Sequence, residues 1–161
     1  MNSRLEDWFA RRSVRVYRQQ EVGDDLVRDL LEAAMAAPSA VAKDPWSFVV
    51  VRSREMLAKI AAGLPNGKML PDAAVGIVVC GDLRRAHDRQ LSYLLQDCSA
   101  AIENLLLAAS ALGLGACWLG VHPREDRVKH IRGLLNIPDP VTPIATLAIG
   151  WPAEPTPPRR S

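Results

Sequence analysis

Residues 88–120 decide the fold, and they read DRQLSYLLQDCSAAIENLLLAASALGLGACWLG. Apolar residues recur at helical spacing through most of this stretch, and few polar residues interrupt them. They are Leu91, Leu94, Leu95, Cys98, Ile102, Leu105, Leu106 and Ala109. This pattern predicts one long, mostly buried helix from about residue 88 to residue 112. Gly113 and Gly115 are expected to end it, and residues 116–119 are predicted to form a short strand.

Shorter elements of both kinds surround this helix. Strands are predicted at WSFVVV (46–51), AVGIVVC (74–80) and residues 142–149. Helices are predicted over residues 3–12, from residue 24 or 25 to just before Pro38, over residues 55–62, and from Pro123 to about residue 135. The spacing is irregular, and no glycine-rich phosphate loop follows the first strand, which argues against a Rossmann unit. We therefore predict an α+β sandwich.

Composition fits one globular domain spanning residues 1–161. Of these residues, 48% are hydrophobic and 24% charged, which is ordinary for a folded protein. The proline-rich tail, residues 152–161, is predicted to lie extended along a surface. No apolar run reaches the roughly 18 residues of a membrane span, and Glu6 and Asp7 argue against a signal peptide. We expect a cytoplasmic protein that binds no membrane, and the net charge of +2 does not indicate a nucleic-acid partner.

Cysteine and histidine spacing gives no metal motif. The cysteines are odd in number, far apart and in apolar surroundings, so they are predicted to be reduced core thiols. The histidines show no ligand-like spacing and have no cysteine close by. The residues concerned are Cys80, Cys98, Cys117, His87, His122 and His130. No metal cofactor is expected.

The segment RRSVR, residues 11–15, is the first place where composition suggests chemistry. Arg11, Ser13 and Arg15 would share one face of an extended chain, with Arg12 between them. Two guanidinium groups and a hydroxyl on one face suit a phosphate, which accepts charge-assisted hydrogen bonds from arginine. The alternative is a solvated basic stretch that closes the preceding helix.

Three further segments follow RRSVR along the chain. The first is Ala37-Pro38-Ser39-Ala40, followed after four residues by Pro45-Trp46-Ser47-Phe48. The second is the long helix and the glycine-rich run GLGACWLG, residues 113–120, and the third is the ending AIGWPAEPTPPRR. Because Trp118 stands where a GxGxxG motif needs glycine, the glycine-rich run is not a dinucleotide fingerprint. The ordered set of four segments spans most of the chain and resembles the nitroreductase-like flavoproteins.

This resemblance implies a sandwich with a central, mostly antiparallel sheet flanked by helices, assembled as a homodimer. It implies FMN as cofactor, with the two flavin sites at the dimer interface. By this resemblance the FMN-binding residues are Arg11, Arg12, Ser13, Arg15, Pro38, Ser39, Ala40, Ala42, Leu119, Gly120, Arg159 and Arg160. The turn at Pro38 and Ser39 would approach the partner's flavin, and the backbone at Leu119 and Gly120 would approach the isoalloxazine ring. Arg159 or Arg160 would reach the phosphate.

Two departures from the family pattern bear on the cofactor contacts and on the dimer. Many relatives have asparagine near the flavin edge and glutamine before the Pro-Trp pair, whereas this chain has Ala42 and Asp44. The chain also ends soon after the tail, without the arm that many relatives wrap around the partner. These departures leave ring contacts in this loop and the tightness of the dimer open.

The resemblance implies an enzyme that passes electrons from NAD(P)H to a small acceptor such as a nitroaromatic or quinone, by a ping-pong mechanism. No catalytic side chain is expected, since flavin N5 carries the hydride and the protein supplies position and electrostatics. Two alternatives remain open. One is a flavoprotein of the same fold with other chemistry, such as flavin cleavage or dehalogenation. The other is a dimeric protein that binds FMN without turnover, which Ala42 and Asp44 make conceivable.

Overall fold

The computed structural model describes residues 2–158 and contains one sheet of four strands. In chain order the strands are β1 (Trp46–Val51), β2 (Val75–Asp82), β3 (Gly115–Gly120) and β4 (Val141–Gly150). Their order across the sheet is β1-β2-β4-β3, and every neighbouring pair is antiparallel. β1, β2 and β4 are rich in β-branched residues, which pack well on a pleated surface.

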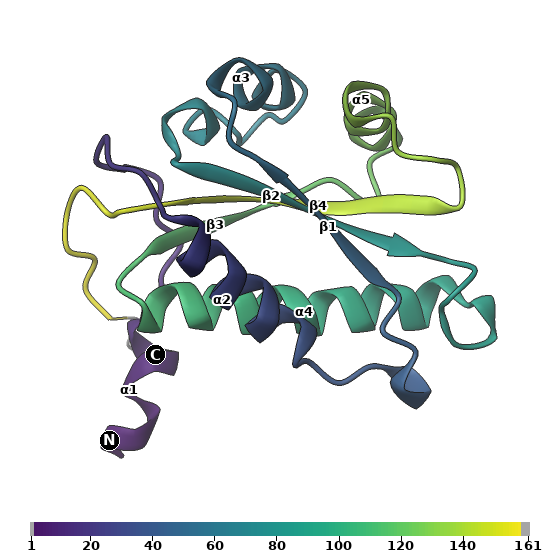
Figure 1. The fold of residues 1–161 in the computed structure, drawn as a ribbon, viewed down its shortest axis with the longest axis horizontal. Helices are drawn as coiled ribbons and strands as arrows, with labels where there is room; N and C mark the ends of the chain where they lie inside the picture. Colours follow the sequence, from purple (N-terminus) through teal and green to yellow (C-terminus); the bar gives the residue numbers. More distant parts are fainter. Residues whose placement is uncertain (1, 159–161) are drawn as a thin grey trace.

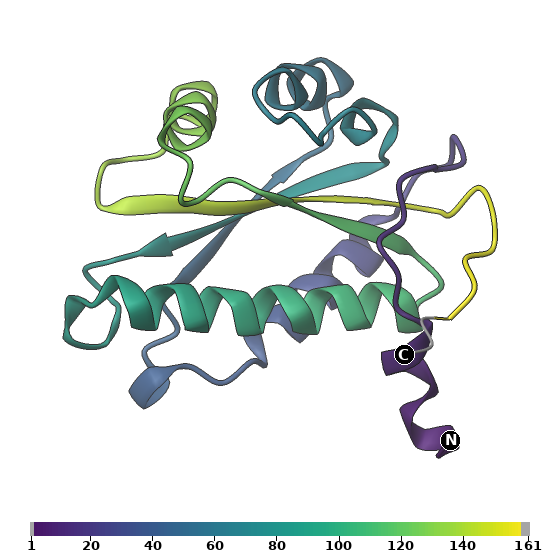
Figure 2. The same ribbon diagram turned by 180° about the vertical axis from the view of Figure 1, so that it is seen from behind.

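Helices cover both faces of this sheet (Figure 1). α2 (Asp24–Met35) and α4 (Leu91–Ala111) lie on one face, and α3 (Arg54–Ala62) and α5 (Glu125–Leu135) lie on the other, as the reverse view in Figure 2 also shows. The short α1 (Glu6–Ala10) lies near the end of α4. Single 3-10 turns occur at Ser3–Leu5, Ala40–Ala42, Leu70–Asp72 and His87–Arg89. The predicted α+β sandwich with an antiparallel sheet is confirmed.

Two apolar clusters hold the layers together. One joins α2 and α4 to the sheet and includes Leu30, Leu105 and Leu147, while the other joins α3 and α5 to the opposite face. All eight residues of β2 are buried, because this strand is central and covered on both sides. Burial of such large apolar side chains is the main favourable contribution to folding.

The structure differs from expectation mainly at the start of α4 and at both ends of the N-terminal helix. α4 begins at Leu91 rather than near residue 88, because Asp88 and Arg89 have φ of 49° and 51° and cannot continue a right-handed helix. Instead of a helix over residues 3–12, a 3-10 turn is followed by α1, which ends at Ala10. Arg11 then turns into extended backbone, with ψ of 125°.

The first segment after α1 and the start of the tail lie side by side. Ser13 forms a parallel bridge to Ala116 at the outer edge of β3, and Tyr17 forms an antiparallel bridge to Pro152. The amide of Ala153 donates to the carbonyl of Val16 at 3.0 Å. These contacts place the arginine-rich segment against β3. Across residues 2–158, no helix is long and apolar enough to cross a membrane.

Candidate cofactor site

The arginine-rich segment, residues 11–15, is held in an extended conformation by Val14, whose side chain is buried. Val14 is buried and donates its amide to the carbonyl of Ala116 at 3.0 Å, while Ser13 and Arg15 remain exposed. The hydroxyl of Tyr17 donates to the carbonyl of Val14 at 2.6 Å and anchors the following turn. Burial raises the pKa of this phenol above its usual range, so Tyr17 serves as a neutral donor.

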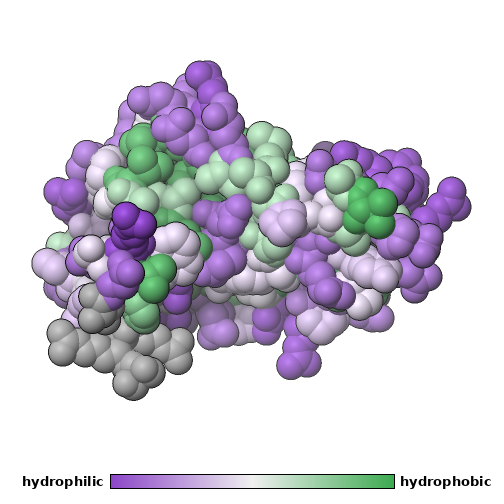
Figure 3. All heavy atoms as spheres, turned by 90° about the horizontal axis from the view of Figure 1, so that it is seen from below, coloured by the Kyte–Doolittle hydropathy of each residue, from purple (hydrophilic) through white to green (hydrophobic). Residues whose placement is uncertain are grey.

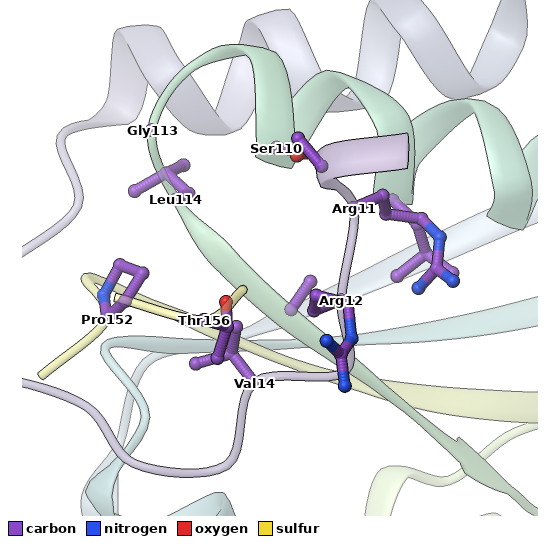
Figure 4. Close-up of a pocket in the computed structure, with 11 residues that line it drawn as sticks. Arg11, Arg12, Val14, Ser110, Gly113, Leu114, Pro152 and Thr156 are labelled. Atoms are coloured by element: carbon purple, nitrogen blue, oxygen red, sulfur yellow. The ribbon is translucent and has the colours of Figure 1, made fainter. Parts of the chain in front are cut away.

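Arg11 and Arg12 line a smaller cavity of about 180 Å³ at the C-terminal end of α4. Figure 4 shows this cavity, with the two arginines along one side and Pro152 across from them. Arg11 is half-buried, and its Nε lies 3.7 Å from a carboxylate oxygen of Glu103 on α4. Arg12 donates to the carbonyl of Pro157. Arg11 therefore already has an ion-pair partner, and Arg12 a hydrogen-bond acceptor, in this structure.

Arg15 faces a larger space, which we call the large cavity, with a volume of about 690 Å³. Its lining includes Arg15, Asn66, Lys68, Met69, Trp118 and Leu119. An adjoining cavity of about 500 Å³ also contains Arg15, Lys68 and Met69 in its wall. Volumes of this size are typical of small-molecule and cofactor sites. Two cationic side chains beside the end of β3 suit a ligand that is both anionic and flat.

The end of β3 presents open backbone to this region. Leu119 is buried and lines the large cavity, whereas Gly120 is exposed and has no atom within 4 Å of the position that a Cβ would take. The carbonyl of Gly120 accepts a hydrogen bond of 2.9 Å from Arg127. A flat ring therefore meets no steric barrier at Gly120.

The loop after α2 lies apart from the arginine-rich segment within one protomer. Ala40 contacts Asp97 in the first half of α4, whereas Arg11 contacts Glu103 in the second half. Figures 1 and 2 agree in placing the loop and the arginine-rich segment toward opposite ends of this helix. Pro38, Ser39, Ala40 and Ala42 therefore do not join Arg15 in the same chain. Arg159 and Arg160 lie outside the described residues.

Asn66, Lys68 and Met69 were not predicted from the sequence. They lie in the irregular segment between α3 and the 3-10 turn Leu70–Asp72, where no periodicity marks a residue that faces a site. The available signal was a lysine and an asparagine beside Gly67 in an otherwise apolar loop. Only the tertiary fold brings them to the same cavity as Arg15.

The cysteines lie in the interior. Cys80, Cys98 and Cys117 are free and buried, and burial raises the pKa of the Cys80 and Cys98 thiols to about 12. Burial also raises the pKa of Cys117, which Arg15 partly offsets. Among residues 2–158, the structure contains no group of three or more histidine, cysteine, aspartate or glutamate side chains that could hold a metal ion.

The chain that forms this antiparallel sheet, covered by helices on both faces and with a cationic cavity at its edge strand, is similar to proteins of a known family. The model of the Nitroreductase family matches residues 9–67 and 55–151. The chain belongs to the nitroreductase family.

Three relatives illustrate the similarity. A candidate NADH dehydrogenase/NAD(P)H nitroreductase from Methanothermobacter thermautotrophicus is 49% identical over 150 residues, which cover 93% of this chain and 78% of that protein. A crystal structure of a candidate NADH dehydrogenase/NAD(P)H nitroreductase from Bacteroides thetaiotaomicron superimposes with a TM-score of 0.93 at 40% identity, covering 100% of this chain and 93% of the other. A candidate nitroreductase from Desulfovibrio desulfuricans, crystallised in complex with FMN, superimposes with a TM-score of 0.85 at 32% identity. The match covers 100% of this chain and 92% of the other.

Proposed function

We propose that this protein is a single-domain, FMN-dependent oxidoreductase of the cytoplasm that passes electrons from NAD(P)H to a small acceptor such as a nitroaromatic or quinone. The observation that carries this proposal is the large cavity, in which Arg15 and Lys68 lie beside the open end of β3. Family membership and a relative crystallised with FMN support the same cofactor.

The residues of the site fit FMN. Arginine forms charge-assisted hydrogen bonds with phosphate oxygens. Arg15 lines the large cavity, whereas Arg11 and Arg12 line the smaller one and are paired with Glu103 and Pro157. We assign the phosphate end to Arg11, Ser13 and Arg15, with Arg12 beside them, which requires Arg11 to exchange Glu103 for the phosphate. Arg159 or Arg160 would complete the phosphate contacts. The ring would lie along Leu119, which lines the large cavity, and Gly120, where the backbone is accessible.

Lys68 and Asn66 add donors to the lining of the large cavity. An ammonium group and an amide there would stabilise negative charge on a bound ring by fixed electrostatics. When bound, FMN supplies the hydride chemistry through its N5 atom. The side chains of this chain hold, orient and electrostatically stabilise the cofactor, and none is assigned as nucleophile or general acid.

We propose a homodimer in which the loop after α2 completes the partner's site. Pro38, Ser39, Ala40 and Ala42 lie toward the opposite end of α4 from Arg11, which is the arrangement expected if they serve the other protomer. Several large apolar side chains are exposed on or beside α1, α2 and α4, and Figure 3 shows apolar surface among polar groups on the face seen from below. They include Leu5, Trp8, Phe9, Met35 and Leu91.

Identification of the cofactor tests this assignment. We expect purified protein, reconstituted with flavin if necessary and then denatured, to release FMN that can be identified by chromatography. A compact phosphate cluster without a dinucleotide fold offers nothing to hold an adenosine. Release of FAD, or no flavin bound after reconstitution, would contradict the proposal.

A single open ring face would serve the two substrates in turn, so we propose ping-pong kinetics. The nicotinamide product would leave before the acceptor binds, because both need the same space. Double-reciprocal plots with NAD(P)H varied at several fixed concentrations of a quinone should be parallel. Intersecting lines would indicate that both substrates bind together and would contradict the shared face.

A further inference from the structure

A buried acidic residue, Asp97 on α4, contacts the loop after α2. Its side chain is 4% exposed, and Oδ1 accepts a hydrogen bond of 2.9 Å from the amide of Ala40. The second oxygen, Oδ2, is buried without a hydrogen-bond partner among the described residues. A buried polar group is costly unless it is hydrogen-bonded. The contact with Ala40 is therefore the interaction that offsets the burial of this carboxyl group.

The loop held by Asp97, residues 39–44, has a strained backbone. Val41, Ala42 and Asp44 have φ of 54°, 51° and 46°, in the left-handed region that side chains disfavour, β-branched ones most of all. Val41 is 69% exposed, so packing of its side chain does not offset the strain. Non-glycine residues keep such conformations only where their surroundings impose them.

Local hydrogen bonds close this loop but do not attach it to the rest of the protein. The Ser39 hydroxyl donates to a carboxylate oxygen of Asp44 at 2.5 Å, and the Asp44 amide donates to Ser39 Oγ at 2.9 Å. The tie to the core is Asp97. The loop is therefore a preformed unit fastened to α4 at the amide of Ala40.

A second polar side chain of α4 holds the chain before the loop. Asn104 donates from its amide to the carbonyl of Ala33 at 3.1 Å. Asp97 and Asn104 are seven residues apart, so they lie on the same face of α4, the face that packs against α2. Together they fix the chain on both sides of the Pro38–Ser39 turn.

We infer that Asp97 is the positioning residue of the 39–44 loop, holding its strained backbone in the conformation that meets the flavin. Asp97 acts through the amide of Ala40. This inference rests on the proposed function, in which the loop completes the partner's flavin site. This role explains why an aspartate, Asp97, lies buried in the first half of α4.

Hydrogen exchange in the flavin-free protein tests this role without any redox activity. The amides of Ala42 and Lys43 donate within the loop to the carbonyls of Ser39 and Ala40, so their exchange reports loop order. D97A should speed their exchange about tenfold or more, the scale set by loss of a hydrogen bond to a carboxyl group. D97N keeps an acceptor oxygen and should stay within about threefold of the wild type.

Gln96→Ala is the matched control, because Gln96 neighbours Asp97 on α4 and its side chain, among residues 2–158, hydrogen-bonds only to Ser92. It should leave the exchange of Ala42 and Lys43 unchanged. If D97A leaves exchange unchanged, or if D97N exchanges as fast as D97A, the positioning role is wrong. These outcomes hold even if the wild-type protein binds no FMN, a result that would instead overturn the proposed function.

A variant on the donor side keeps the test open should D97A fail to fold. Ala40→Pro removes the amide hydrogen at the first position of the short helix, where proline is tolerated. Ser39 is extended, with φ of −137° and ψ of 158°, which suits a residue before proline. Exchange of Ala42 and Lys43 should rise as in D97A, and a folded A40P protein with unchanged exchange would overturn the role of this hydrogen bond.

Discussion

Arg15 and Lys68 line the same two adjoining cavities, although one follows α1 and the other lies in the loop after α3. The larger of the two cavities also borders the edge strand β3, at Trp118 and Leu119. Two cations in the lining of the same cavities favour binding of an anionic ligand there.

Removing either cation should weaken FMN binding. Arg15→Ala should reduce affinity by about 1.5 to 3 kcal/mol, the scale of a hydrogen bond to a charged group, and Arg11→Ala and Lys68→Ala should act in the same direction. Titration of the flavin-free protein with FMN, followed by flavin fluorescence, measures this change. Arg28→Ala is the control, because Arg28 lies exposed on α2 and its loss should leave affinity unchanged. Unchanged affinity in both Arg11→Ala and Arg15→Ala would remove the phosphate assignment.

The protein should sediment as a homodimer at micromolar concentration. The loop that carries Pro38 and Ser39 lies apart from Arg15 in one chain, so a complete site needs a second copy. Exposed Trp8 and Phe9 supply apolar surface near the end of α4, and such surface favours association. Analytical ultracentrifugation of the flavin-loaded protein provides the measurement. A stable monomer that retains flavin would rule out the shared site.

Much of the fold followed from local patterns. The strand at residues 46–51 and the limits of α4 within a few residues were predictable, because β-branched runs and helical periodicity are properties of neighbouring residues. The start of α4 was missed because the left-handed conformations of Asp88 and Arg89 have no periodic signature.

The candidate site was less accessible to sequence reasoning. Alternation predicted that Arg11, Ser13 and Arg15 would share a face, and Ser13 and Arg15 are indeed both exposed, but the ion pair between Arg11 and Glu103 depends on packing of α1 against α4. Lys68 and Asp97 were missed for the same reason. Their roles arise from contacts between segments far apart in the chain.

Stability should fall in alkaline solution because of the buried thiols. The pKa of Cys80 and of Cys98 is about 12 in the folded protein, against an ordinary value of 9.0. Below pH 9 the thiols are protonated in both the folded and the unfolded protein, so burial of the neutral thiols makes its full contribution to stability. As pH rises toward 12 the unfolded chain loses these protons first, and the contribution is lost.

Urea denaturation of the wild type and of Cys98→Ala, at pH 8 and at pH 11, measures this contribution. The variant should lose less stability between the two pH values, since it lacks one of the two ionisations. Equal losses would show that Cys98 does not contribute. As an independent check, thiol reagents at pH 8 should label the native protein much more slowly than the urea-unfolded protein.

No histidine should be required for turnover. His130 contacts the carbonyl of Lys59 at 2.8 Å between α5 and α3, and His87 lies beside Asp88. His87→Ala, His122→Ala and His130→Ala should each retain activity within a few fold, because none lines the large cavity. Loss of about a hundredfold in any one of them, the scale of a general acid or base, would reveal a proton donor absent from this account.

The central claim is that the protein uses NAD(P)H to reduce its own bound FMN. The most direct measurement is to add NADH, and separately NADPH, to the flavin-loaded protein without oxygen and to follow the visible flavin absorption band. We predict rapid bleaching with at least one of them, followed by return of the band when a quinone or nitroaromatic is added. A band that persists with both nicotinamides would contradict the oxidoreductase and would indicate a protein that binds FMN without turnover.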